Sequence, residues 1–122
     1  MIAYSTLGTN DMDRSIAFYD AVFGAIDGAR ESTSPSWTVY GRAGERPKVA
    51  LTPPYDKQAA QPGNGPMLAF ETDAYEKVDA FHAAALAHGG SDEGLPGVRE
   101  GTHYVAYARD PEGNKLCVFA KA

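Results

Sequence analysis

The chain has 122 residues, of which 43% are apolar, and a formal net charge of −5 at pH 7. This length predicts one compact domain over residues 1–122, and the acidic balance excludes a nucleic-acid-binding face. The sequence has no apolar segment long enough to cross a bilayer, no signal-peptide pattern at its start and a single cysteine, so we expect a cytoplasmic protein without membrane contact.

The first half of the chain predicts a strand, a helix and then further strands. Ile2–Gly8 has the composition of a short strand, and Asn10 or Asp11 is suited to cap a helix that ends near Gly24. The apolar face of this helix is Met12, Ile16, Tyr19, Val22 and Phe23. The strands expected after the helix are Trp37–Gly41 and Lys48–Thr52, with a further short one compatible with Ala29–Ser34.

The second half repeats this order after a stretch rich in proline and glycine, Pro53–Pro66. Met67–Thr72 predicts a strand, and Asp73 is a candidate cap for a second helix. The apolar stripe of that helix is Val78, Phe81, Ala85 and Leu86, ended by Gly89 and Gly90. The last expected strands are Tyr104–Ala108 and Leu116–Ala120, and the stretch Gly89–Thr102 is predicted to be irregular.

A tight turn at Asp110–Lys115 joins the last two predicted strands. Pro111 stands at the second turn position and Gly113 at the fourth, which is the pattern of a type I turn. The Asp110 side chain is able to bond back to the backbone of such a turn. The sequence therefore predicts a β-hairpin near the end of the chain.

The two halves can be overlaid. A shift of 63 residues places Tyr4 on Met67, and a shift of 67 places Ala50 on Cys117. Repetition on this scale predicts two modules related by a pseudo-twofold axis, at about residues 1–52 and 67–122 with residues 53–66 as linker. The alternative is an ordinary α+β sandwich whose repeat is accidental.

Several motifs in this order resemble the vicinal oxygen chelate superfamily, which includes glyoxalase I, extradiol dioxygenases, and bleomycin and fosfomycin resistance proteins. They are Tyr4–Tyr19, Met67–Phe70, Val78–Gly90 and Tyr104–Asn114, and the last two are similar to a bacterial glyoxalase-like subgroup. The resemblance implies an α+β fold of two βαβββ modules, with a curved mixed sheet around a cavity and the helices outside. It does not imply one function, because this fold hosts many activities.

The resemblance also implies where a metal ion would bind. Superfamily members that bind metal supply His, Glu or Gln from four strand positions, which correspond here to Tyr4, Ala50, Met67 and Cys117. Alanine has no donor atom, methionine is a weak ligand, and tyrosine and cysteine ligate only when deprotonated. We therefore expect no metal and no other cofactor, and glyoxalase I activity is not expected.

Strand alternation predicts which side chains line the cavity. If Cys117 faces inward, so do Lys115 and Phe119, and the third strand of the first half adds Trp37 or Tyr40. The candidate ligand-binding residues are Tyr4, Trp37, Met67, His103, Tyr107, Arg109 and Cys117, and no catalytic residue is identified. Cys117 itself fits either a buried small residue or a reactive thiol.

Three functions remain compatible with the sequence. The first is a metal-free protein that binds a small apolar or aromatic molecule in the cavity. The second is a metal-independent lyase, isomerase or hydrolase that uses His103 or Tyr107 for acid–base chemistry. The third is a structural module with a filled core. Many members of the superfamily build their cavities between two chains, so the resemblance also implies a homodimer.

Overall fold

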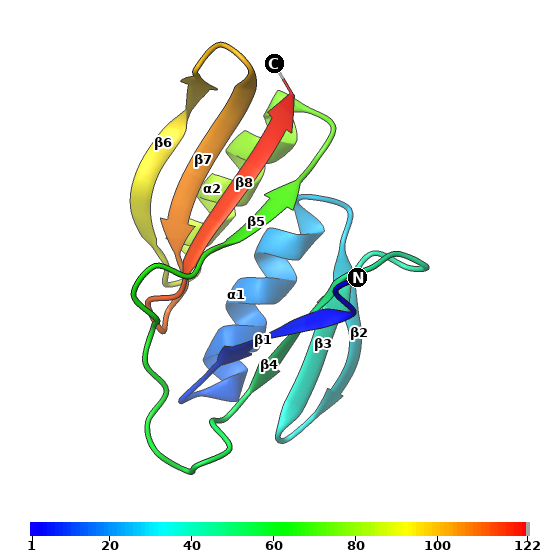
Figure 1. Cartoon of the computed structure of the whole chain (residues 1–122), viewed down its shortest axis with the longest axis vertical. Helices are drawn as coiled ribbons and strands as arrows, with labels where there is room; N and C mark the ends of the chain where they lie inside the picture. The colour runs from blue at the N-terminus through cyan, green and yellow to red at the C-terminus, as the bar shows by residue number, and fades with distance from the viewer. Residues whose placement is uncertain (122) are drawn as a thin grey trace.

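The structure is a computed structural model that describes residues 1–121 of the chain. Two helices and eight strands follow one another as β-α-β-β-β, twice (Figure 1), which confirms the α+β class and the repeated module. The first module contains β1 (Tyr4–Gly8), α1 (Met12–Gly24), β2 (Ala29–Ser34), β3 (Trp37–Gly41) and β4 (Lys48–Thr52). The second contains β5 (Leu68–Glu71), α2 (Tyr75–Ala87), β6 (Ser91–Arg99), β7 (His103–Arg109) and β8 (Lys115–Lys121).

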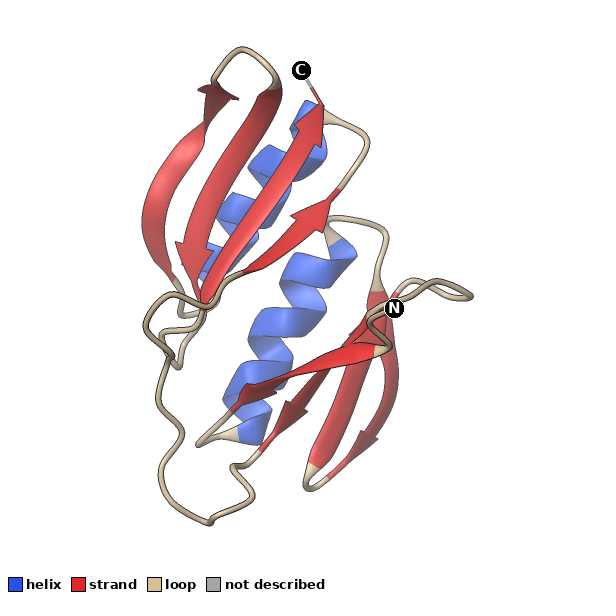
Figure 2. Ribbon diagram, in the orientation of Figure 1, coloured by secondary structure: helices blue, strands red, loops and turns tan. Residues whose placement is uncertain are grey.

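Each module forms its own four-stranded mixed sheet, as Figure 2 shows. The strand orders are β1-β4-β3-β2 and β5-β8-β7-β6, and in each sheet only the first and last strands of the module pair in parallel. Thr6 lies opposite Ala50 in the first sheet, and Ala69 lies opposite Cys117 in the second. The two pairs are equivalent under the sequence shifts of 63 and 67 residues, as the predicted repeat requires.

The two helices pack against each other in a core that both modules share. Each helix covers one face of its own sheet, and in Figure 1 α2 lies behind β7 and β8. Phe70 of β5 joins the modules, because its ring lies 5.3 Å from that of Phe23 in α1 and 5.8 Å from that of Phe81 in α2. The other face of each sheet therefore turns away from the helices, and the described strands close no barrel.

The turn between β7 and β8 has the predicted type I geometry. The amide of Gly113 donates to the carbonyl of Asp110 at 2.9 Å, and the Asp110 side chain accepts from the amides of Glu112 and Asn114. Gly113 has a φ of +93°, a conformation that glycine adopts at little cost. The prediction that Asp110 bonds back to its own turn is confirmed.

Two predictions about the second module were wrong. β6 occupies most of the stretch predicted to be irregular, because register shifts around Gly94 and Gly97 interrupt the alternation by which a strand is recognised. Asp73 does not cap α2. The N-cap residue is Ala74, which has no side chain that could make the capping hydrogen bond. The Asp73 carboxylate binds Lys77 instead, at 2.8 Å.

The linker 53–66 contains no helix or strand and appears in Figure 2 as the long loop below the second sheet. Asn10 fixes its middle, since the Asn10 side chain accepts from the amide of Ala60 at 2.6 Å and donates to the Ala60 carbonyl at 3.1 Å. Neither helix of residues 1–121 combines the length and apolarity that a membrane crossing requires.

Candidate functional site

The outer face of the first sheet carries an open aromatic hollow. We call this surface face A and define it by Tyr4, Trp37, Val39 and Ala50, which line a hollow of about 520 Å³. The rings of Tyr4 and Trp37 meet edge to face at 5.7 Å, and both remain exposed, by 55% and 37%. Large aromatic side chains left open on a concave surface are typical of a binding site.

The outer face of the second sheet carries a smaller hollow. We call it face B and define it by His103, Tyr107, Cys117 and Phe119, which line about 300 Å³. The rings of His103 and Phe119 lie 5.3 Å apart, edge to face. The ammonium of Lys115 lies 5.4 Å from the centre of the Tyr107 ring, so face B joins aromatic surface with a cation.

The remaining candidates lie apart from these two faces. Met67 lines a third hollow between β1 and β5, beside Thr6 and Lys115. Arg109 pairs with Glu93 and donates to the carbonyl of Gly113 at 2.9 Å, so its guanidinium stabilises the hairpin.

We expected all the candidates around one concave surface, but within one chain they divide between separate hollows. The cause is the packing of α1 against α2. This packing turns the outer faces of the two sheets away from a shared centre.

Cys117 has the environment of a packed small residue. Cys117 is buried on β8 with its side chain toward the face B hollow, and burial raises the pKa of the thiol, which Lys115 only partly opposes. A raised pKa keeps the sulfur protonated and unreactive near neutral pH. The prediction that Cys117 is a buried strand residue is confirmed.

The polar groups of face B include His103 and Tyr107, the two candidates for acid–base chemistry. His103 Nδ1 lies 2.9 Å from the hydroxyl of Thr102, its neighbour in sequence. The Tyr107 hydroxyl has no hydrogen-bond partner among residues 1–121. Thr102 thus orients His103, and acid–base chemistry at His103 or Tyr107 stays a prediction.

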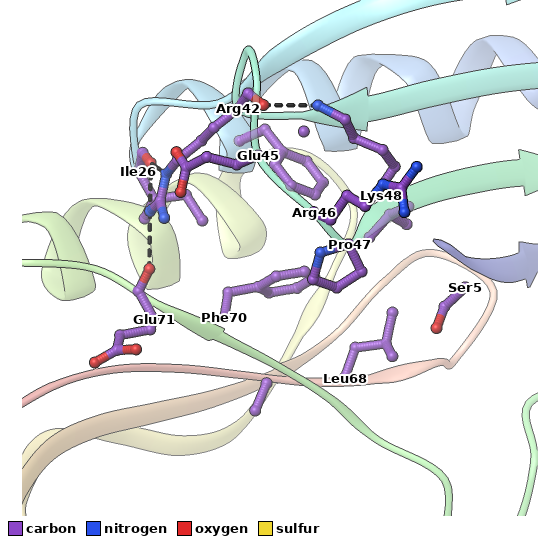
Figure 3. A pocket seen from close by; sticks show the side chains of 14 residues that line it. Ser5, Ile26, Arg42, Glu45, Arg46, Pro47, Lys48, Leu68, Phe70 and Glu71 are labelled. Atoms are coloured by element: carbon purple, nitrogen blue, oxygen red, sulfur yellow. Dashed lines mark hydrogen bonds between the residues drawn. The ribbon is translucent and has the colours of Figure 1, made fainter. Parts of the chain in front are cut away.

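A further cleft lies between the modules, away from both outer faces (Figure 3). It has a volume of about 350 Å³ and is lined by the β3–β4 connection, the end of α1, and β5. Arg42 spans it, donating to the carbonyls of Ile26 and Glu71 at 2.8 Å each. No sequence pattern predicts this cleft, because it forms where the two modules meet.

The family model for the glyoxalase/bleomycin resistance protein/dioxygenase superfamily matches residues 1–118. The chain belongs to this superfamily. A glyoxalase/bleomycin resistance protein from Albidiferax ferrireducens T118 is 36% identical, with all of this chain and 99% of that one covered and a TM-score of 0.91. No curated protein matches the chain significantly.

Two more distant structures share the fold. A glyoxalase/bleomycin resistance protein/dioxygenase family enzyme from Burkholderia phytofirmans PsJN is 22% identical, with a TM-score of 0.79 over 98% of both chains. A lactoylglutathione lyase from Agrobacterium tumefaciens is also 22% identical, with a TM-score of 0.67 over 98% of this chain and 92% of that one.

The metal positions of the superfamily do not fit a metal ion in this chain. Tyr4 and Ala50 lie on face A, Cys117 on face B, and Met67 in the third hollow. None of the four is a histidine or a carboxylate, the donors that first-row metals prefer in such sites. Among residues 1–121, no group of three or more His, Cys, Asp or Glu is arranged to hold a metal ion.

Val39 and Arg46 line the face A hollow but lay outside the predicted site. Val39 stands opposite Ala50 on face A, just as Tyr107 stands opposite Cys117 on face B. The internal repeat implies that Val39 and Tyr107 are equivalent, because their strand partners, Ala50 and Cys117, are aligned with each other. Arg46 carried no such signal, since it belongs to a loop between strands.

Proposed function

We propose that this protein binds a small apolar or aromatic molecule on its outer sheet faces, without a metal ion. The observation that carries the proposal is the exposed Tyr4–Trp37 pair above an apolar floor of Val39 and Ala50. Burying one aromatic ring there removes apolar surface from water, at about 25 cal/mol per Å². After the costs of association, this gain supports affinities of about micromolar.

We propose further that the site is completed by a second copy of the chain. Face A and face B lie in different hollows, so each is a half-site in one chain. β1 and β5 lie at free edges of their sheets, which leaves their backbone groups available to another strand. In a homodimer with face A of one chain against face B of the other, both aromatic walls surround one ligand.

A metal-free site agrees with the donor chemistry at the superfamily positions. Tyr4 and Met67 offer mainly apolar surface there, and Ala50 has no donor atom. The Cys117 thiol, the remaining donor, is protonated because burial raises its pKa. We also propose a cytoplasmic location, which suits a single unpaired thiol.

Trp37 is the only tryptophan of the chain and reports on face A directly. We expect phenyl and cyclohexyl compounds, such as benzyl alcohol and cyclohexanol, to change its fluorescence and raise the melting temperature together. Val39→Arg should abolish both effects, because the new side chain fills the hollow. Val98→Arg is the matched control, since Val98 is exposed on β6 and lines neither face.

The proposal is wrong if such compounds stabilise the protein while Trp37 emission stays constant and Val39→Arg binds normally. Elemental analysis of protein purified without chelator should find well under one transition-metal equivalent per chain. Light scattering should give 26.0 kDa, twice the 13.0 kDa of one chain. A mass of one chain at micromolar concentration would refute the dimer.

A further inference from the structure

The cleft between the modules has an apolar floor. Phe23 and Ile26 contribute from the end of α1, and Val49 from β4; all three are buried. Leu68 and Phe70 of β5 form the opposite wall, and Figure 3 shows their side chains directed into the cleft. A volume of about 350 Å³ lies within the range of small-molecule pockets.

The polar groups of the cleft are separated by charge. Figure 3 shows the side chains of Arg46, Lys48 and Ser5 at one end, and the carboxylates of Glu45 and Glu71 toward the other, near Arg42. One end of the cleft therefore favours an anion, and the apolar floor lies between the two ends.

At the cationic end of the cleft, Arg46 is the side chain whose hydrogen-bond donors are free to bind an anion. Lys48 already binds Glu31 at 2.7 Å and the Arg42 carbonyl at 2.6 Å. Among residues 1–121, by contrast, the Arg46 guanidinium has neither an ion-pair nor a hydrogen-bond partner, and the Ser5 hydroxyl has no partner either. A planar guanidinium binds a carboxylate through two parallel hydrogen bonds, which makes it specific for that group.

We propose that the intermodule cleft is a second binding site, for a small carboxylate with an apolar body of about the size of a phenyl ring. The carboxylate binds Arg46 and Ser5, and the apolar body lies against Phe70 and Leu68. This site is separate from the outer faces, although Arg46 and Lys48 line the border of both the cleft and face A.

Titration calorimetry with 4-phenylbutyrate and its neutral amide tests the proposal on the intact protein. The wild type should bind the carboxylate about tenfold more tightly than the amide, because the hydrogen bond to Arg46 is charge-assisted. In Arg46→Gln this preference should disappear, with binding of the amide unchanged. Arg30→Gln is the matched control, since Arg30 lies on β2 and lines neither the cleft nor the outer faces, and it should keep the full preference.

Two further variants locate the ligand. Ser5→Phe places a ring in the cleft and should abolish the preference for the carboxylate, while Trp37→Ala alters face A, where phenyl rings also bind under the proposed function, and should keep that preference. The proposal is overturned if neither compound binds, if Arg46→Gln retains the preference, or if folded Ser5→Phe keeps the full preference. Loss of the preference in Trp37→Ala but not in Ser5→Phe would place the carboxylate on face A, which overturns the cleft site and leaves the proposed function intact.

Discussion

The hydroxyl of Tyr19 donates a hydrogen bond of 2.6 Å to Asp110 Oδ2, and both residues are buried. The bond joins α1 of the first module to the hairpin turn of the second. Burial, and then the Asp110 carboxylate, raises the pKa of Tyr19 well above its ordinary value, so the hydroxyl remains a donor. The same carboxylate accepts hydrogen bonds from the amides of Glu112 and Asn114 in the turn. The Tyr19 bond therefore fixes the position of the β7–β8 turn relative to α1.

Replacing Tyr19 by Phe should therefore lower the free energy of unfolding by about 1–3 kcal/mol, because a buried carboxylate loses a donor. Urea unfolding measures the change. Tyr55→Phe is the control, since Tyr55 is almost fully exposed, and should stay within about 0.5 kcal/mol of the wild type. If the free energy of unfolding of Tyr19→Phe also stayed within that range, the Tyr19–Asp110 hydrogen bond would not stabilise the contact between the modules.

Glu112 makes a second connection between the modules. Its carboxylate accepts from the Asn10 amide at 2.6 Å and from Arg14 at 3.0 Å, at the start of α1. Burial, the largest effect, raises the pKa of Glu112, but the bonds from Asn10, Arg14 and Thr9 outweigh it and lower the pKa below 4.5.

A folded-state pKa below the unfolded value stabilises the protein above the unfolded pKa, and that stability is lost as the pH falls through the folded pKa. We expect the unfolding free energy of the wild type to fall as acid is added below pH 4.5, and Glu112→Gln to weaken this dependence. Glu112→Gln should also lose about 1.5–3 kcal/mol at pH 7. Parallel pH profiles for the two proteins would contradict this account, with Glu100→Gln as the exposed control.

The Cys117 thiol should react slowly with Ellman's reagent in the folded protein. It is buried and its pKa is raised, so little thiolate is present at neutral pH. Denaturation in urea should expose the thiol and allow complete reaction. Complete labelling of the native protein at neutral pH as fast as in urea would show that the sulfur is open and ionised.

The sequence predicted the parts of this fold that depend on local pattern or on the repeat. Asp11 caps α1 through the Arg14 amide at 3.1 Å, one of the two caps expected. The shifts between Tyr4 and Met67 and between Ala50 and Cys117 predicted which positions of the two sheets are equivalent. Capping, turn chemistry and alternation are short-range signals, which a single sequence preserves.

The rest depends on contacts between distant residues. Glu112 and Asn10 are 102 residues apart, and no spacing rule predicts that they meet. The division of the site into face A and face B follows from the contact between α1 and α2, which the apolar stripes of the helices allow but do not specify. The intermodule cleft has the same origin.

The central claim is that face A of one chain and face B of another surround one ligand. Mixing Trp37→Ala with Tyr107→Ala tests it most directly, by calorimetry with the phenyl compound that binds the wild type most tightly. Each variant alone should lose binding. After subunit exchange, only the mixed dimer contains a cavity with both wild-type faces, so about one quarter of all sites should bind again. No recovery in the mixture, although exchange is complete, would contradict the shared site.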